Sequence, residues 1–450
     1  MSVTAIVWVL GILTFTVLSL KRPVWSIALY MQTFFAAPQN WWWGDQVPSV
    51  RYAFWAGFVL LFAVVLYRAQ SSDNESHKIS GPHKAAILMA LNATFVHIVL
   101  AVDRGISSNS YLELIKFSLL FYLIWSAIRD KRDFRTALMA IAVGAFYIGY
   151  EVTINGRGDF NGSRLEGVGA PGADASNSLA DLMLVCLPLA SSLLILGQWR
   201  HKIVAACAAP LVLNVLLLCN SRGAFLGLVG TGVVFLLIAR GKTRKRALQV
   251  LSLGSLALFL LLGDPKILTR FTTTFAGSEE RDNSAESRLL FWKAGLRQMS
   301  DYPLGAGGGS FKFRLGKRYQ ASVSGDDNVV DRALHQGYLT EGTDWGFQGL
   351  IVKLSMFWLA FLAAFRTEEA CRREGRVNEA LVGLCIMTSA IGLSIHCFFG
   401  DFFASEWAYW VMALLLRYSE LYKVPEPEQP MERFTPQPSD AQPVFAVHGA

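Results

Sequence analysis

Long apolar runs are the feature that most constrains the fold of this chain. Residues 2–20, 52–67 and 224–239 each form a stretch without a single charged side chain. These lengths suit helices that cross a hydrocarbon layer about 30 Å thick. Apolar residues make up 53% of the 450-residue chain and charged residues only 17%, so the lipid bilayer is its main solvent.

The apolar runs predict helices, because backbone groups inside a bilayer must find their hydrogen bonds within the segment. The alternating pattern of membrane β-strands is absent. We therefore expect an all-α, polytopic membrane protein with about 12–13 transmembrane helices. The expected spans lie near residues 2–20, 24–38, 52–67, 85–102, 111–128, 135–153, 178–197, 203–219, 223–239, 247–263, 344–365, 379–399 and 403–420.

Positive charge is concentrated in alternate connections between these spans. Its carriers are Lys21, Arg22, Arg68, Lys78, Lys84, Arg129, Lys131, Arg132, Arg135, Arg200, Lys202, Arg240, Lys242, Arg244, Lys245, Arg246, Arg366, Arg372, Arg373 and Arg376. The positive-inside rule makes these connections cytoplasmic and places 38–51, 154–177 and 264–340 outside. The net charge of +7 is thus a topological signal, and nucleic acid is not an expected partner.

The spans and loops divide the chain into four expected parts. Transmembrane helices occupy 1–263 and 344–423, and a large, partly helical external loop occupies 264–343. The proline-rich remainder, 424–450, is an expected disordered cytoplasmic tail. The first segment has no basic n-region or A-x-A cleavage site, so we expect a retained anchor rather than a signal peptide.

Neither the cysteines nor the histidines and carboxylates predict a metal centre. The six cysteines lie in or beside the spans without C-x-x-C spacing, so they do not indicate a disulfide framework either. No histidine pair has metal-ligand spacing, and no D-x-D cluster is present to hold a divalent ion on a sugar donor. We expect no metal and no cofactor. His97 and His396 stand in or at the ends of spans, where packing or a helix–helix hydrogen bond is the expected role.

Three arginines near the expected outer boundary are candidate anion ligands. Arg222 follows Asn220 and Ser221 between two apolar stretches, so it sits at a membrane boundary beside a helix N-terminus that suits a diphosphate. The alternative is an arginine that only anchors the helical hairpin at the interface. Arg164 lies in the Gly/Asn/Asp-rich segment 155–180 and is a further cation for an outward cavity.

Arg288 lies in the first turns of an expected amphipathic helix over 282–300. Asn283 and Glu286 have capping-box spacing, and the apolar face that would rest on the membrane surface consists of Leu289, Trp292, Leu296 and Met299. A cation near a helix N-terminus is disfavoured, which indicates a nearby anion. Either a ligand or Glu286 or Asp282 fills that role. The glycines that follow, 305–309, fit neither a P-loop nor a dinucleotide motif.

His335 is the candidate catalytic residue. It stands in the external loop shortly before a span that starts near Asp344, with Tyr338 and Glu341 close by in sequence. An imidazole with a pKa near neutrality can take a proton from a sugar hydroxyl. The residues alone leave a structural role for this histidine equally open.

The spacing around His335 resembles that of a known family. His335-Gln336, followed after nine residues by Gly346-Phe347-Gln348-Gly349, resembles the H-[NSQ]-x9-G-x-x-[GTY] signature of bacterial O-antigen ligases. NSRGAFLGL (220–228) resembles the S-R-[GS] opening of a span in the wider ligase/polymerase superfamily. Residues 287–311 resemble its R-x-x-x-W…P-x-G-x-G-x-[NS]-F segment, and the N-terminal spans resemble ligases associated with exosortases.

The resemblance implies a C-class glycosyltransferase fold in the bacterial inner membrane, with its active site on the periplasmic face. The implied donor is a glycan on undecaprenyl diphosphate, and transfer inverts the anomeric centre without a metal ion. By position, Arg222 and Arg288 match family arginines that hold the donor diphosphate, and His335 matches the proposed base. Arg164 corresponds to another donor-side cation.

Several functions compete on these observations. The leading hypothesis is a ligase that moves a preassembled glycan to a glycolipid (lipid A core) or protein hydroxyl, with membrane lipids around it. A polymerase that joins lipid-linked repeats is the nearest alternative. A transporter or flippase would explain the intramembrane charges Lys116 and Lys353, although the chain shows no repeated halves. A structural scaffold would not need His335.

Overall fold

The computed structural model describes residues 1–70, 79–162, 164–242, 244–246, 248–249, 252, 279–325 and 332–424. Side chains are described for these residues except 279–287. The expected span 247–263, the expected tail 424–450 and parts of the external loop therefore lie largely outside the described residues.

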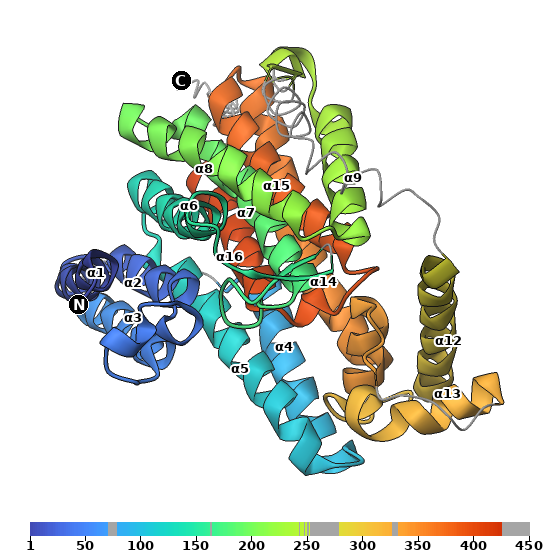
Figure 1. The fold of residues 1–450 in the computed structure, drawn as a ribbon. Coiled ribbons are helices and arrows are strands. Elements are labelled where there is room, and N and C mark those ends of the chain that lie inside the picture. The colour runs from blue at the N-terminus through green and yellow to red at the C-terminus, as the bar shows by residue number, and fades with distance from the viewer. Residues whose placement is uncertain are drawn as a thin grey trace, which may run out of the picture.

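The described chain is almost entirely helical, so the prediction of an all-α membrane protein is confirmed (Figure 1). The first nine helices are α1 Val3–Ser19, α2 Val24–Phe35, α3 Tyr52–Gln70, α4 Gly81–Phe95, α5 Arg104–Ala127, α6 Lys131–Thr153, α7 Ser176–Leu196, α8 Trp199–Leu218 and α9 Arg222–Ile238. The later helices are α12 Glu279–Asp301, α13 Gly316–Ser324, α14 Gly337–Arg373, α15 Val377–His396 and α16 Glu406–Leu421.

Short elements complete the described chain. The helical turns are η1 Pro38–Asn40, η2 Gly44–Gln46, η3 Val96–Leu100, η4 Phe311–Leu315 and η5 Phe402–Ala404. A two-stranded antiparallel hairpin, β1 Asp159–Asn161 and β2 Arg164–Glu166, leads into α7, with Asn161 opposite Arg164. This hairpin fixes the expected external segment 155–180 against the helices.

Every expected span outside 247–263 is helical, but their lengths differ. Eight of the described helices are long and apolar enough to cross a membrane. Helices α1 and α9 have 17 residues each, α16 has 16 and α2 only 12. The expected number of 12–13 spans is thus not reached by length and composition among the described residues. The span expected at 344–365 is longer than expected, because α14 runs from Gly337 to Arg373.

Helices α7 and α15 form the centre of the membrane part. They pack against each other, α7 also against α6 and α8, and α15 also against α9 and α14. These two are the most buried of the eight long spans. Polar contacts also join them, since the Ser389 hydroxyl of α15 donates to the carbonyl of Val185 on α7 at 2.9 Å.

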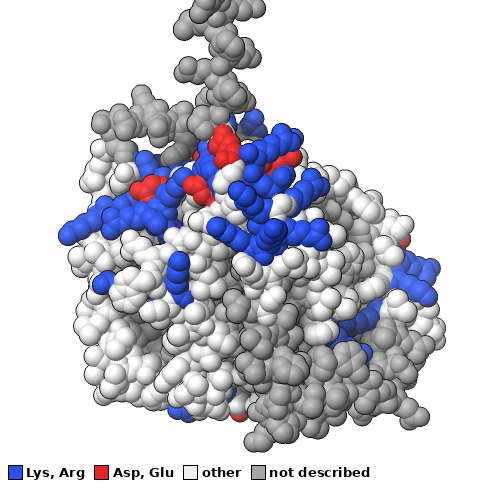
Figure 2. Space-filling model, turned by 90° about the horizontal axis from the view of Figure 1, so that it is seen from above, with Lys and Arg blue, Asp and Glu red and all other residues white. Residues whose placement is uncertain are grey.

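Basic side chains and ion pairs gather at one end of the helix bundle. Arg22 forms ion pairs with Asp130 at 2.7 Å and Asp133 at 2.9 Å, and Lys131 pairs with Glu379 at 2.9 Å. These contacts hold three of the expected cytoplasmic connections together. Figure 2 views the molecule from the top of Figure 1 and shows lysine and arginine side chains gathered on part of that end. Helices α12 and α13 lie at the lower end (Figure 1).

The surface helix expected over 282–300 is present as α12, but two details of that prediction were wrong. The helix already begins at Glu279, so Asn283 lies inside it rather than at its N-cap; the side chains of Asn283, Glu286 and Asp282 lie outside those described. Leu289 and Leu296 are about half exposed, whereas Met299 is buried. The packed face includes Phe291 and Ala294, because α13 and the loop before α14 cover that side of the helix.

Candidate functional site

Two non-glycine residues in the described chain have left-handed backbone conformations, and both belong to the candidate site. Asn220 has a φ of 47° and His335 a φ of 50°. Such conformations cost about 1–3 kcal/mol each and cluster at functional sites. Asn220 stands just before α9, which begins at Arg222, and His335 stands just before α14. The two strained turns therefore set how the chain enters the helices that carry the site.

The turn at His335 is held by the connection between α15 and α16. Asp401 accepts a hydrogen bond from the backbone N–H of Gln336 at 3.2 Å and from the Thr340 hydroxyl at 2.5 Å. The N–H of Gly337 donates to the carbonyl of Cys397 at 2.7 Å. Gln336 itself caps α14, its side chain accepting from the N–H of Leu339. The residues that directly follow His335 are therefore held in place by α14 itself and by the connection between α15 and α16.

The surroundings of His335 favour the neutral imidazole. Burial lowers the pKa of this half-buried residue, the negative charge of Asp401 opposes that shift, and the positive charges of Arg288, Arg332 and Lys312 lower the pKa further. Each effect has the expected sign, since low dielectric and nearby cations disfavour an imidazolium. A neutral imidazole at physiological pH can accept a proton.

The structure brings the three candidate arginines together, although they come from β2, α9 and α12. The guanidinium of Arg288 is half buried, and burial together with the like charges of Arg164 and Arg222 lowers its pKa. Arg164 donates to the amide oxygen of Asn177 at 2.7 Å. Among the described residues, none of the three arginines forms an ion pair with a carboxylate. Positive charges without a carboxylate partner favour the binding of an anionic ligand.

A chain of buried hydrogen bonds stabilises the N-terminus of α9, which begins at Arg222. Ser221 caps this helix, its Oγ accepting from the N–H of Ala224 at 3.3 Å. The same Oγ lies 3.4 Å from Nε2 of His396, whose Nδ1 lies 2.8 Å from Asp181. Asp181 also accepts from the indole N–H of Trp407 at 2.6 Å. The expected helix–helix hydrogen bond of His396 is thus present, and it ties α7, α9, α15 and α16 together beneath Arg222.

The glycine-rich loop after α12 docks on a break in α14. Gly346 has a φ of 81° inside α14, and a Cβ there would lie 2.4 Å from the carbonyl carbon of Leu304. The N–H groups of Ala306 and Gly307 donate to the carbonyls of Thr343 and Asp344, at 3.1 and 3.0 Å. This backbone-to-backbone contact leaves no room for side chains.

The two ends of the H-Q-x9-G-F-Q-G pattern therefore have different structural roles. Gln348 donates to the carbonyl of Leu304 at 2.8 Å and to the amide oxygen of Asn92 on α4 at 3.1 Å. Gly346 and Gln348 thus join α14, α4 and the loop that follows α12. The glycine end of the pattern joins helices, whereas His335 at the other end lies under the influence of the charge of Arg288.

Tyr338, a predicted supporting residue, points away from that cluster. Its hydroxyl donates to the carbonyl of Ser394 on α15 at 2.7 Å. The ring lines an apolar groove of about 400 Å³ between α14 and α15, together with Leu354, Phe357, Trp358, Phe361, Ala390, Ile391, Ser394 and Phe403. Its place is thus at a groove of the membrane part rather than beside the His335 imidazole.

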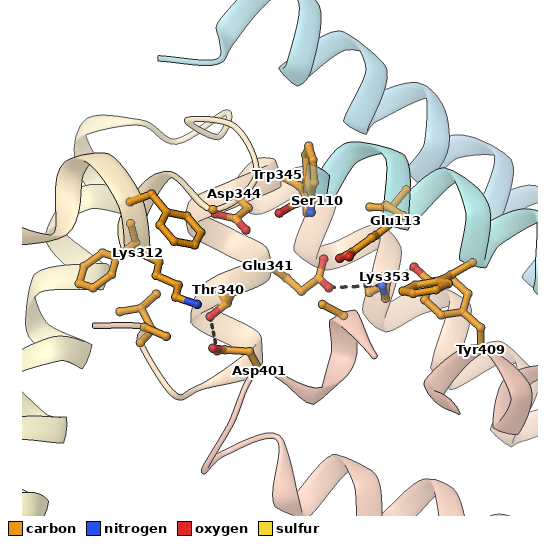
Figure 3. Close-up of a pocket in the computed structure, with 18 residues that line it drawn as sticks. Ser110, Glu113, Lys312, Thr340, Glu341, Asp344, Trp345, Lys353, Asp401 and Tyr409 are labelled. Atoms are coloured by element: carbon orange, nitrogen blue, oxygen red, sulfur yellow. Dashed lines mark hydrogen bonds and ion pairs between the residues drawn. The ribbon is translucent and has the colours of Figure 1, made fainter. Parts of the chain in front are cut away.

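A second cavity, of about 290 Å³, adjoins the His335 turn (Figure 3). Its wall is built from α5, η4 and the residue before it, the segment before α14, the N-terminal half of α14, and α16 with the connection before it. The charged side chains in the wall are Glu113, Lys312, Glu341, Asp344, Lys353 and Asp401. Asp401 thus contacts the His335 turn with one face and the cavity with the other.

Residues 203–354 match the family model of O-antigen ligase. The matched segment contains Arg222, Arg288 and His335, whereas Arg164 and Asp401 lie outside it. The match supports the predicted resemblance of this segment to the O-antigen ligase superfamily. Members of the O-antigen ligase family are glycosyltransferase-like membrane enzymes, and the family implies lipid-linked glycan substrates. No curated protein matches the chain.

Asp401 is the site residue that the sequence analysis missed. It lies in the short connection FFGDFF (398–403) between two apolar spans. A carboxylate in a short connection between two apolar spans is the same kind of signal that singled out His335. The O-antigen ligase-like sequence does not predict that this connection packs on the turn at His335.

Proposed function

We propose that this O-antigen ligase-like protein transfers a preassembled glycan from undecaprenyl diphosphate to an acceptor hydroxyl on a glycolipid, such as lipid A core, or on a protein. The bond between the anomeric carbon and the diphosphate breaks, and a bond to the acceptor oxygen forms. The diphosphate leaves with the electron pair, and the acceptor proton passes to His335.

The observation that carries this proposal is that the charge of Arg288 acts on His335, while the charges of Arg164 and Arg222, from separate elements, act on Arg288. A departing diphosphate needs its growing negative charge stabilised, and preorganised cations provide that stabilisation. Guanidinium groups bind phosphate oxygens in pairs and remain charged at any physiological pH. The positive charges of Arg164 and Arg222 repel that of Arg288, so an anion bound among them reduces this repulsion.

The neutral imidazole of His335 suits the acceptor side of a single displacement. A base that takes the hydroxyl proton as the oxygen attacks speeds such a step by about 10²–10⁴-fold. Attack from the side opposite the leaving group inverts the anomeric centre. In this proposal the arginines provide the charge that a metal ion supplies in other glycosyltransferases.

The membrane part supports a lipid-linked donor. The apolar groove beside Tyr338 lies between α14 and α15, the helices that carry and brace the His335 turn. We assign this groove to the isoprenoid chain of the donor. The basic end of the bundle faces the cytoplasm and the arginine cluster faces the periplasm, in keeping with the positive-inside rule.

The mass of the product tests the proposal. The purified protein is incubated in lipid nanodiscs with a defined undecaprenyl-diphosphate glycan, with and without a candidate acceptor. We expect an acceptor–glycan adduct and free undecaprenyl diphosphate only when acceptor is present. Chain lengthening with donor alone identifies a polymerase instead. Intact donor in all mixtures contradicts a transferase of either kind.

A further inference from the structure

Two ionisable side chains are buried in the membrane part without a role in the proposed transfer. Asp181 on α7 is fully buried, and His396 at the end of α15 is 1% exposed. Ionisable groups inside a membrane are costly and therefore indicate a functional site. A capping serine alone is enough for a helix N-terminus, as Ser2 shows at α1. The N-terminus of α9 at Ser221 thus has more buried polar partners than a helix cap requires.

The carboxylate of Asp181 fixes the orientation of the His396 ring. Its Oδ1 lies 2.8 Å from Nδ1 of His396, and its Oδ2 accepts from the indole N–H of Trp407 at 2.6 Å. Because a carboxylate only accepts hydrogen bonds, Nδ1 carries a proton. Nε2 is then the ring atom that faces Ser221, 3.4 Å from its Oγ. A carboxylate that binds one imidazole nitrogen in this way fixes the direction of the other.

The first turn of α9 lies directly against the His396 ring. A Cβ at Gly223 would lie 2.8 Å from Cδ2 of His396 and 2.6 Å from Cβ of Phe399, so only glycine fits there. Gly223 follows Arg222 in the chain. A shift of the ring would therefore move the backbone turn that carries the Arg222 guanidinium.

The same ring also reaches the elements that hold the start of α14. It packs on Phe402, with the ring centroids 4.3 Å apart. Phe402 follows Asp401, whose carboxylate binds the first turn of α14. The carbonyl of Cys397, directly after His396, accepts from the N–H of Gly337 at 2.7 Å. His396 thus lies between the start of α9 and the start of α14.

We propose that His396, oriented by Asp181, is a positioning residue that sets Arg222 relative to the turn at His335. The inference rests on the proposed transfer reaction, in which Arg222 holds the diphosphate and His335 takes the acceptor proton. A single displacement needs the leaving group and the base on opposite sides of the anomeric carbon. A misplacement of about 1 Å costs about 10²-fold in rate. Neither His396 nor Asp181 touches the substrate.

The main test is His396→Asn. Asparagine keeps an N–H donor near the place of Nδ1, so Asp181 retains a partner, but the shorter side chain does not reach Ser221. His83→Asn is the matched control, because His83 is also buried, at 3% exposure, and stands at the start of α4 on the expected cytoplasmic side. A residue that only supports packing lowers the unfolding temperature, and a positioning residue also changes the kinetics.

Ser221→Ala is a second variant, which keeps the test valid if His396→Asn does not fold. It removes the contact to Nε2 together with the cap of α9. Ser2→Ala removes the corresponding cap of α1 and is its control. Each protein is placed in lipid nanodiscs. The measurements are the unfolding temperature, binding of undecaprenyl diphosphate, and transfer of a defined glycan followed by product mass.

We expect His396→Asn and Ser221→Ala each to weaken binding of undecaprenyl diphosphate about tenfold. His396→Asn should also lower kcat at least about tenfold, because the turn at His335 loses part of its support. The two controls should lower only the unfolding temperature. In an Arg222→Ala background, neither variant should weaken diphosphate binding further, because the effect passes through this arginine.

Additive losses in the Arg222→Ala background, or an equal loss of diphosphate binding in His83→Asn, overturn the positioning role. A normal kcat in folded His396→Asn overturns the link to the turn at His335. The binding measurement distinguishes failure of the reaction itself. Diphosphate binding that weakens in His396→Asn but not in His83→Asn, with no transfer by any protein, upholds the positioning of Arg222 and overturns the proposed function.

Discussion

The carboxylate of Asp401 accepts a hydrogen bond from the backbone N–H of Gln336 at 3.2 Å, directly after His335 in the chain. This contact joins the connection before α16 to the start of α14. It holds a backbone turn that is unfavourable by itself, since His335 has a φ of 50°. The position of the candidate base is thus set by a residue of another segment.

Replacement of His335 by alanine should abolish transfer while the donor still binds. The imidazole is expected to take the acceptor proton, so its loss lowers kcat by about 10²–10⁴-fold with little change in donor affinity. The measurement is product mass against time, alongside binding of the undecaprenyl-diphosphate glycan in nanodiscs. Near-normal turnover in this variant rules out the role of His335 as base.

The pH profile should report the neutral form of His335. Because burial and nearby cations lower its pKa, kcat/KM should stay level around neutral pH and fall only below the ordinary imidazole value of about 6.5. The charge of Asp401 raises this pKa, so Asp401→Asn should move the acid limb to lower pH. Asparagine keeps an acceptor oxygen for Gln336. A shift of the limb to higher pH contradicts this account.

Replacement of Arg222 or Arg288 by alanine should weaken use of the donor. Each loses a charge-assisted contact to the diphosphate, which is worth about 1.5–3 kcal/mol or roughly a ten- to hundredfold rise in donor KM. Arg288→Lys should recover only part of the loss, because an ammonium cannot bind two phosphate oxygens in a fixed plane. The exposed Arg314, replaced by alanine, is the control. Unchanged donor kinetics in both variants would show that these arginines do not bind the donor.

Replacement of Gly346 by alanine should loosen the joint between α14 and the loop after α12. The new Cβ would lie 2.4 Å from the carbonyl carbon of Leu304, at a φ of 81° that alanine disfavours. We expect a loss of at least about 2 kcal/mol, measured as a lower unfolding temperature in detergent. Gly232→Ala is the matched control, because a Cβ at Gly232 meets nothing within 4 Å. Equal effects of the two substitutions contradict this role of Gly346.

The sequence by itself determined the helical membrane architecture. An apolar run such as residues 52–67 must form a helix in lipid, because its backbone groups have no hydrogen-bond partners outside the segment. Helix α3 forms there. Local spacing likewise singled out Arg222, Arg288 and His335, because their pattern is carried by neighbouring residues. These are properties of short segments, and they do not depend on what packs against them.

Only the tertiary structure decided which segments meet. The three arginines converge from β2, α9 and α12, Asp401 holds the turn at His335, and the cavity wall combines α5 with α14 and the connection before α16. The burial of Met299 on α12 was not predicted for the same reason. Hydropathy records only how apolar each residue is, whereas burial and electrostatics depend on the atoms of distant segments.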